Sequence, residues 1–255
     1  METPDIQVDP ANGSSGARRA STFVLVHGAW HGGWCWKAVA RILRAHAHQV
    51  YTPTLSGLGE RAHLLSDSID LRVFIQDVVN VIEYEDLTDV ILVGHSFGGL
   101  PLIGAADRVP QRLRQLVFLD AVVLDHGQTA FSRLAPEIVS ARIRQAMETS
   151  DGLTIPVPPA SAFGITDPVQ AALLEDKCTP HPLKTFDDPI VLKGPVGGTL
   201  PKVYIQCTNP VYAPLQASRD FVRTQNGWTW DEIGTGHDAM ISAPGVLADM
   251  LLKLA

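Results

Sequence analysis

Hydrophobic residues recur along this chain with two different spacings. Short, nearly unbroken aliphatic runs predict strands that are buried on both faces. These runs occupy 22–26, 50–53, 90–93, 116–119, 202–207 and 228–233. Between them, apolar residues recur every three or four positions, which is typical of helices with one buried face. The predicted helices are 36–47, 71–84, 97–107, 214–223 and 244–254. This alternation of strand and helix predicts a mostly parallel sheet flanked by helices, an α/β fold.

The alternation stops after Asp120. Residues 125–195 contain proline clusters and helical stretches but no predicted strand, so we expect an inserted cap that folds over the carboxyl edge of the sheet. The core then consists of residues 21–124 and 196–255. Residues 1–20 are polar and rich in Pro, Gly, Ser and Ala, a composition that predicts a disordered leader.

The central motif is a serine on a predicted turn between a strand and a helix. Gly94-His95-Ser96-Phe97-Gly98 fits the pattern Gly-x-Ser-x-Gly and directly follows the run 90–93. A pentapeptide of this kind also occurs by chance in glycine-rich turns, but strand, tight turn and helix are the context that a nucleophile elbow requires. The sharp turn projects the hydroxyl away from the sheet and leaves little room for neighbouring side chains. Ser96 is therefore the predicted nucleophile.

A serine nucleophile needs a base, and nine histidines compete for that role. His237 lies in Gly-Thr-Gly-His just after the last predicted strand, where a loop can place its imidazole over the serine. The alternative interpretation is a solvated loop histidine. His95 lies inside the elbow and is expected to point away from it, and His27 is expected to be structural or to line the pocket. His237 is the predicted base.

The acid that orients the base is less obvious. The order serine, acid, histidine usually places the acid after the strand that here is 202–207, but the following residues contain no carboxylate. Asp220 lies farther along and is expected on a helix surface. Asp120 ends the strand after the nucleophile strand, at the same carboxyl edge, and is the predicted acid. An Asp120 that only caps a turn, with a serine–histidine dyad oriented by Asn209 or water, stays open as an alternative.

Two backbone N–H groups should form an oxyanion hole next to the serine. One is expected from Phe97, directly after the serine, and the other from Ala29, in the loop after the first strand. Trp30 and His31 in the same loop are the expected pocket wall, and Met240 is a third candidate for it.

Composition and charge restrict the classes of partner. The chain of 255 residues has a net charge of −7 and contains no basic cluster, which argues against nucleic acid as a partner. No apolar stretch is long enough to span a membrane. Three separated cysteines argue against a disulfide framework and favour the cytoplasm. No His, Cys, Asp and Glu cluster has the spacing of metal ligands, so we expect neither a metal nor a cofactor. A homodimer stays open.

Several segments resemble a known superfamily of enzymes. His27–Trp34, Gly94–Gly99 and Gly236–Met240 together resemble the α/β-hydrolase superfamily, and within it the small esterases that include plant methyl salicylate esterase and the hydroxynitrile lyases. Thr52–Arg61 and Asp77–Asp86 resemble bacterial esterases and carbamate-cleaving hydrolases of the same group. The resemblance covers residues 22–122 and 200–255.

The resemblance implies hydrolysis without a cofactor, through an acyl-enzyme. It also implies that Ser96 is the nucleophile, that His237 is the base and that the backbone N–H groups of Ala29 and Phe97 form the oxyanion hole. The missing acid after the strand 202–207 departs from the plant enzymes, but some relatives take the acid from the end of the strand after the nucleophile, which supports Asp120.

Hydroxynitrile lyases of the group have a threonine and a lysine where this chain has Gly28 and Asp238. A lyase needs a cation to hold the departing cyanide, so lyase activity is not expected. The sequence therefore predicts a serine hydrolase of small, largely apolar carboxylic esters. The alternatives are an amidase or carbamate hydrolase acting on an aromatic substrate, and a non-catalytic small-ligand receptor on the same fold.

Overall fold

A computed structural model of the chain describes residues 20–255, so the predicted leader lies outside the described residues except for Ala20. Its centre is a six-stranded sheet in the order β2-β1-β3-β4-β7-β8, in which every neighbouring pair is parallel. The strands are β1 (Thr22–Val26), β2 (Gln49–Tyr51), β3 (Val90–His95), β4 (Leu113–Leu119), β7 (Lys202–Cys207) and β8 (Trp228–Ile233). This architecture confirms the predicted fold class.

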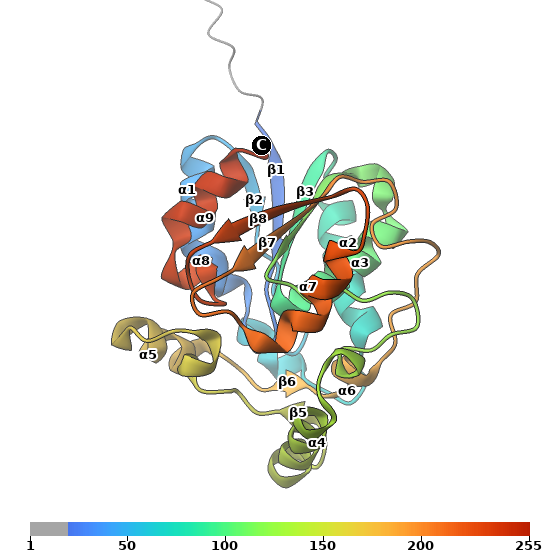
Figure 1. Cartoon of the computed structure of the whole chain (residues 1–255), viewed down its shortest axis with the longest axis vertical. Coiled ribbons are helices and arrows are strands. Elements are labelled where there is room, and N and C mark those ends of the chain that lie inside the picture. Colours follow the sequence, from blue (N-terminus) through green and yellow to red (C-terminus); the bar gives the residue numbers. More distant parts are fainter. Residues whose placement is uncertain (1–19) are drawn as a thin grey trace, which may run out of the picture.

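Helices cover both faces of the sheet (Figure 1). One face carries α1 (Lys37–Ala45), α8 (Ala239–Ser242) and α9 (Pro244–Leu252), and the other carries α2 (Leu71–Tyr84), α3 (Gly99–Arg108) and α7 (Gln216–Arg223). Successive strand residues point to opposite faces, so in β3 Ile91 and Val93 pack on the first side while Val90 and Leu92 pack on the second. Burial on both faces explains the unbroken aliphatic runs.

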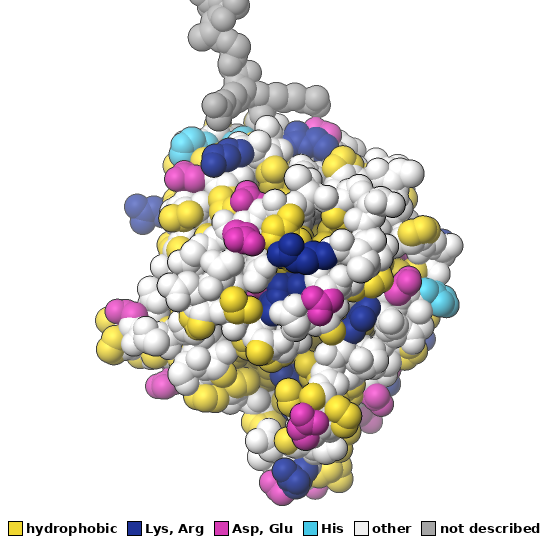
Figure 2. All heavy atoms as spheres, viewed as in Figure 1, with side chains coloured by type: hydrophobic (Ala, Val, Ile, Leu, Met, Phe, Trp, Pro, Cys, Tyr) yellow, Lys and Arg dark blue, Asp and Glu magenta, His cyan; other side chains and the backbone are white. Residues whose placement is uncertain are grey.

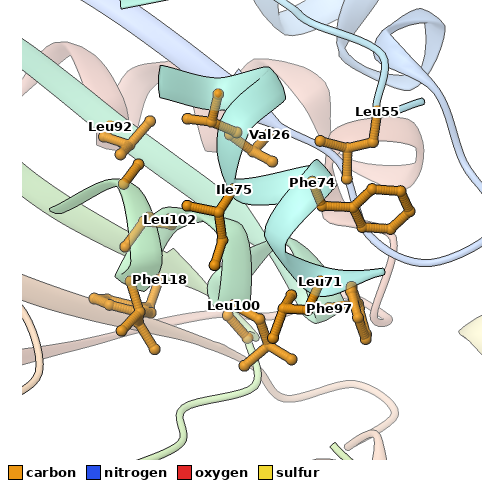
Figure 3. Packing of buried hydrophobic residues seen from close by; sticks show 14 of the residues in the cluster. Val26, Leu55, Leu71, Phe74, Ile75, Leu92, Phe97, Leu100, Leu102 and Phe118 are labelled. Carbon is orange, nitrogen blue, oxygen red and sulfur yellow. The ribbon is translucent and has the colours of Figure 1, made fainter. Parts of the chain in front are cut away.

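The packing of α2 against α3 shows how the helical pattern is used. Asp70 accepts a hydrogen bond from the N–H of Val73 at 3.1 Å and thereby caps the start of α2. Leu71, Phe74 and Ile75 then face the core (Figure 3). A Cβ at Gly104 of α3 would overlap the side chain of Ile75, so glycine there permits the two helices to approach closely.

Some predicted elements have the observed bounds, and the others differ by a few residues at their ends. Strands 22–26, 202–207 and 228–233 and helix 71–84 have the predicted bounds. The strand predicted at 116–119 begins at Leu113 in the structure. The predicted start was too late because Arg114 interrupts the apolar run. The Arg114 side chain donates to Ser21 Oγ and to the carbonyl oxygen of Leu254 at the rim of the sheet. The remaining short turns are the 3-10 helices η1 (Gly33–Trp36), η2 (Gly59–Leu64), η3 (Ser96–Gly98), η4 (Pro110–Arg112), η5 (Phe131–Arg133), η6 (Ala160–Phe163) and η7 (Ala213–Leu215).

Residues 125–195 gather at one end of the sheet (Figure 1). They contain α4 (Pro136–Ser150), α5 (Pro168–Lys177) and α6 (Lys184–Asp187). The expectation of no strand in this segment was wrong: β5 (Thr154–Ile155) pairs antiparallel with β6 (His181–Pro182). Each of these strands is only two residues long, which is too short to produce a recognisable period in the sequence.

The surface has no dominant charge on the face drawn in Figure 2, where basic and acidic side chains are interspersed with hydrophobic ones. Among residues 20–255, no helix is both long enough and apolar enough to cross a membrane.

Candidate active site

Ser96 occupies a strained turn between β3 and α3. Its φ of 52° lies in the left-handed region, which is rare for a residue with a side chain. A Cβ at Gly98 would lie 2.5 Å from the carbonyl oxygen of His27, and one at Gly94 would lie 2.7 Å from the carbonyl oxygen of Gly98. Both contacts are closer than any real Cβ tolerates, so the two glycines of the motif are sterically required.

The three predicted catalytic side chains form one hydrogen-bonded chain. His237 Nδ1 lies 2.7 Å from Asp120 Oδ2, and His237 Nε2 lies 2.9 Å from Ser96 Oγ. His237 and Asp120 are buried, whereas Ser96 is partly exposed. A carboxylate only accepts, so Nδ1 carries the proton that it donates to Asp120, and Nε2 is free to accept the proton of the serine. This is the geometry that a serine nucleophile requires.

Asp120 reaches this position because it directly follows β4. Its N–H donates to the carbonyl oxygen of Ile205 on β7 at 2.7 Å. The N–H of Val122 donates to the carbonyl oxygen of Ser96 at 2.9 Å. The backbone after β4 is thus attached both to the neighbouring strand and to the elbow. Asp220 and Asn209, the other candidates, are exposed at the surface and do not contact His237.

Sequence reasoning missed the second partner of Asp120. Arg219 on α7 is 1% exposed, and its Nη1 lies 3.3 Å from Asp120 Oδ1. Its Nη2 donates to the carbonyl oxygen of Tyr212 at 3.0 Å and to Gln216 Oε1 at 3.2 Å. Each carboxylate oxygen of Asp120 therefore has its own partner. A signal was present, because Leu215, Arg219 and Val222 share one helical face and two of the three are apolar.

Arg219→Met should destabilise the protein by about 3–5 kcal/mol, because it leaves the carboxylate of Asp120 buried with a single partner. Chemical denaturation of the two proteins measures the change. Arg223→Met on the same helix is the matched control. The Arg223 guanidinium is exposed, stacks on Trp230 at 3.8 Å and lies 4.0 Å from Glu232, so its loss should cost about 1 kcal/mol or less. Equal losses of stability in the two variants would contradict the assigned role of Arg219.

A buried histidine network lies beneath the imidazole of His237. His95 Nε2 lies 3.0 Å from the carbonyl oxygen of His237, and His31 bonds through Nε2 to Asp238 Oδ2 at 3.1 Å and through Nδ1 to the carbonyl oxygen of Ala29 at 2.8 Å. His31 thereby connects the loop after β1 to the residue next to His237.

The charges in this network follow from burial and pairing. Burial lowers the pKa of His95 well below its usual value, so His95 is neutral. Burial also opposes the charged form of His31, yet the carboxylate of Asp238 raises the pKa of His31 above its usual value. Burial alone would raise the pKa of Asp238, but the charge of His31 and the hydrogen bond to it outweigh this effect and lower it. His31 and Asp238 therefore form a buried ion pair.

The cavity beside Ser96 has a volume of about 430 Å³ including its open mouth. Ala29, Trp30 and Phe97 line it from the core, and Arg142 and Phe186 line it from the residues 125–195. The segment after β7 supplies Tyr212, Pro214, Leu215 and Ser218.

Two predicted pocket residues do not line this cavity. His31 is buried beneath the loop after β1, because its ring nitrogens bond to Asp238 and Ala29. Met240 is fully buried on the α1 and α9 side of the sheet, because α8 turns away immediately after His237. Both predictions are corrected: closeness in sequence to a site residue does not fix the direction of a side chain.

The predicted oxyanion donors, Ala29 and Phe97, both face the cavity. Phe97 lies in the first turn of η3, where backbone N–H groups have no acceptor within the helix. Among residues 20–255, no acceptor pairs with the N–H of Ala29. By contrast, the N–H of Trp30 donates to His181 Nδ1 at 3.3 Å. Two free donors thus lie next to Ser96.

One group of side chains in the described residues could in principle bind a metal, namely His95, His237 and Asp238. His237 already uses both ring nitrogens, for Asp120 and Ser96, and Asp238 is paired with His31. A zinc ion held there would have to break the hydrogen bonds of His237. Activity should therefore survive treatment with EDTA, measured as the initial rate of hydrolysis. A loss of activity that added zinc restores would overturn this prediction.

Comparison with known proteins places this geometry in a family. Residues 23–250 match the family described as the alpha/beta hydrolase family. The chain belongs to the alpha/beta hydrolase family. It is 38% identical over 242 residues to the carbendazim hydrolyzing esterase of Nocardioides sp. (strain SG-4G), covering 92% of this chain and 99% of that protein. It is 27% identical over 254 residues to the esterase PIR7B of Oryza sativa subsp. japonica, covering 91% and 95%.

Solved structures of the family share the fold over nearly the whole chain. An extracellular alpha/beta-hydrolase from a Paenibacillus species, which is described as structurally and functionally homologous to tobacco salicylic acid binding protein 2, matches with a TM-score of 0.79. The sequence identity is 26%, and the match covers 91% of this chain and 98% of that one. This confirms the resemblance inferred from the sequence motifs.

Proposed function

We propose that this alpha/beta hydrolase cleaves small, largely apolar carboxylic esters through a serine acyl-enzyme. The observation that carries the proposal is the hydrogen-bonded chain Ser96–His237–Asp120 at the base of a largely apolar cavity. Full-length similarity to proteins named as esterases supports the ester as the bond cleaved. In this proposal, residues 125–195 act as a cap that completes the cavity from the far side.

The reaction follows from the geometry. Ser96 Oγ attacks the ester carbonyl carbon while His237 Nε2, 2.9 Å away, accepts its proton. The N–H groups of Ala29 and Phe97 donate to the negative charge that develops on the carbonyl oxygen. His237 then donates its proton to the departing alcohol, which leaves the acyl group on Ser96. A water molecule, deprotonated by His237, attacks the acyl-enzyme and releases the acid.

Asp120 performs two tasks in this scheme. By accepting from Nδ1–H at 2.7 Å it holds the imidazole in the tautomer that leaves Nε2 unprotonated, and its negative charge stabilises the imidazolium that forms. Tyr212 stacks on the same imidazole with ring centroids 4.0 Å apart and limits how far it can rotate. The base is thus fixed from its edge and from its face.

The experiment that tests the function is hydrolysis of p-nitrophenyl esters of increasing acyl chain length, followed by labelling with an organophosphonate. We expect release of p-nitrophenol, a preference for short or medium acyl groups, and labelling of Ser96. Ligand binding without turnover of any ester in the panel would refute the proposal and favour a receptor on this fold. Labelling of another residue would refute the assignment of the nucleophile.

A further inference from the structure

Arg142 lies in the wall of the cavity beside Ser96 and forms no ion pair among residues 20–255. Arg142 lies on α4, and its guanidinium carbon is 5.6 Å from the ring centre of Trp30 and 5.1 Å from that of Phe186. Tyr212 is a third neighbour of this side chain. All three of these neighbours line the same cavity as Ser96, so the charged end of Arg142 lies at the cavity wall.

Two other arginines lie nearby, and both have partners that lie away from the open cavity. Arg133 also lines the cavity, but its Nη2 donates to Gln128 Oε1 at 2.8 Å and its guanidinium lies over Phe221, at 5.1 Å. Neither of those partners lines the cavity. Arg219 is bound to the carboxylate of Asp120. Arg142 differs from Arg133 because the aromatic rings next to its guanidinium, Trp30 and Phe186, themselves line the cavity.

The environment of Arg142 is unfavourable for a lone charge. No Asp or Glu lines the cavity, and no ion pair joins Arg142 to any carboxylate among residues 20–255. Of the titratable side chains near Arg142, Tyr212 is neutral because burial raises its pKa, and His181 is neutral because burial lowers its pKa well below the usual value. Burial also lowers the pKa of Arg142 from its ordinary value. A guanidinium in an apolar wall gains most from an anion that it can bind through two hydrogen bonds.

We propose that Arg142 forms a subsite for a carboxylate, so that the preferred substrates are esters with an apolar body and a free carboxylate away from the scissile bond. Half-esters of dicarboxylic acids have this chemistry. Trp30 and Phe186 would pack on the apolar body, and the guanidinium would bind the carboxylate through two parallel N–H donors. The inference rests on the proposed ester hydrolysis at Ser96 and specifies which esters fit.

A matched pair of substrates isolates the effect of the substrate carboxylate. Monomethyl glutarate and dimethyl glutarate have the same chain and the same scissile methyl ester, and only the first carries a carboxylate. The wild-type enzyme should hydrolyse the monoester with the higher kcat/KM. Arg142→Met should lower kcat/KM for the monoester by about 10- to 100-fold, since a hydrogen-bonded contact to a charged group is lost. The same substitution should lower kcat/KM for the diester by about threefold or less.

The matched control is Arg144→Met. Arg144 lies on the same helix and is exposed, so its replacement removes the same charge from the protein without removing a group at the cavity. Both esters should be hydrolysed at wild-type rates by this variant. Arg142→Lys keeps the charge but not the paired donors, and should retain part of the preference for the monoester.

Binding without catalysis separates this inference from the proposed function. Calorimetry with glutarate on Ser96→Ala and on Ser96→Ala with Arg142→Met should show about 10- to 100-fold weaker binding in the double variant. If dimethyl glutarate is hydrolysed and neither substrate preference nor glutarate binding depends on Arg142, the subsite is refuted while the esterase stands. If no ester is hydrolysed by any variant, the proposed function fails, whatever the calorimetry shows. If the near-UV circular dichroism of the Arg142→Met variants matches that of their parents, an altered cap is excluded as the cause of weaker glutarate binding.

Discussion

Ser96→Ala is expected to lower kcat by about 10⁶-fold while leaving the fold intact, the size of the loss seen when a serine nucleophile is removed elsewhere. Alanine keeps the Cβ and loses only the hydroxyl, which makes one hydrogen bond, to His237. The free energy of unfolding should therefore change by about 1 kcal/mol or less. The residual rate would come from the oxyanion donors and from substrate binding.

Steady-state hydrolysis and organophosphonate labelling, read by mass spectrometry, measure this effect. Ser218→Ala is the matched control, because Ser218 also lines the cavity but its hydroxyl accepts from the N–H of Val123 at 3.1 Å rather than contacting His237. That variant should keep its activity within about tenfold and should still be labelled at Ser96. An active Ser96→Ala variant would mean that another group is the nucleophile.

Asp120→Asn is expected to lower kcat by about 10⁴-fold, the loss measured for the equivalent change in a serine protease. The amide has the size of the carboxylate, but its NH₂ group can donate to Nδ1 and so favour the tautomer with the proton on Nε2. In that tautomer the imidazole cannot accept the proton of Ser96. Arg219 would also lose its charged partner, so a drop in stability should accompany the loss of rate.

Kinetics together with ¹⁵N NMR of the histidine side chains separate the two effects. The tautomer of His237 should change in Asp120→Asn and not in Asp220→Asn, in which the replaced carboxylate is exposed and accepts from Gln216. Near-normal turnover by Asp120→Asn would remove Asp120 from the mechanism and leave the serine–histidine dyad as the explanation.

The arrangement of the site could be predicted because three strand ends place it. Ser96, Asp120 and His237 follow β3, β4 and β8, and in a parallel sheet all carboxyl ends lie at one edge. Identifying the strands therefore located the three side chains without knowledge of the helices. The predicted acid, Asp120, was located by the same reasoning, since β4 is the neighbour of β3 in the sheet.

The residues that sequence reasoning missed depend on contacts between distant segments. Arg219 reaches Asp120 from another helix, and Arg142 reaches the cavity from α4, which also exposes Ile138, Ile143 and Met147 and so shows no clear apolar face. No local spacing of hydrophobic residues in the sequence marks such positions.

The loop after β1 was misjudged for a different reason. Trp30 has a φ of 66° and lies in a turn. Its indole points toward the residues 125–195 and donates to the carbonyl oxygen of Ile155 at 3.2 Å, while the next residue, His31, points beneath the site. Two adjacent residues thus face opposite ways. A non-glycine left-handed residue is too rare to be anticipated from the sequence.

Because Asp120 follows β4, the segment after β7 carries no reacting group itself, although Tyr212 and Arg219 in it contact His237 and Asp120. That segment instead supplies Tyr212, Pro214 and Leu215 to the cavity wall. The short turn 213–215 thus contributes to the cavity wall without contacting Ser96, His237 or Asp120 through a hydrogen bond. Substitutions confined to 213–215 are expected to change which substrates this enzyme prefers without moving Ser96, His237 and Asp120. Natural relatives can diverge in substrate preference by the same kind of substitution.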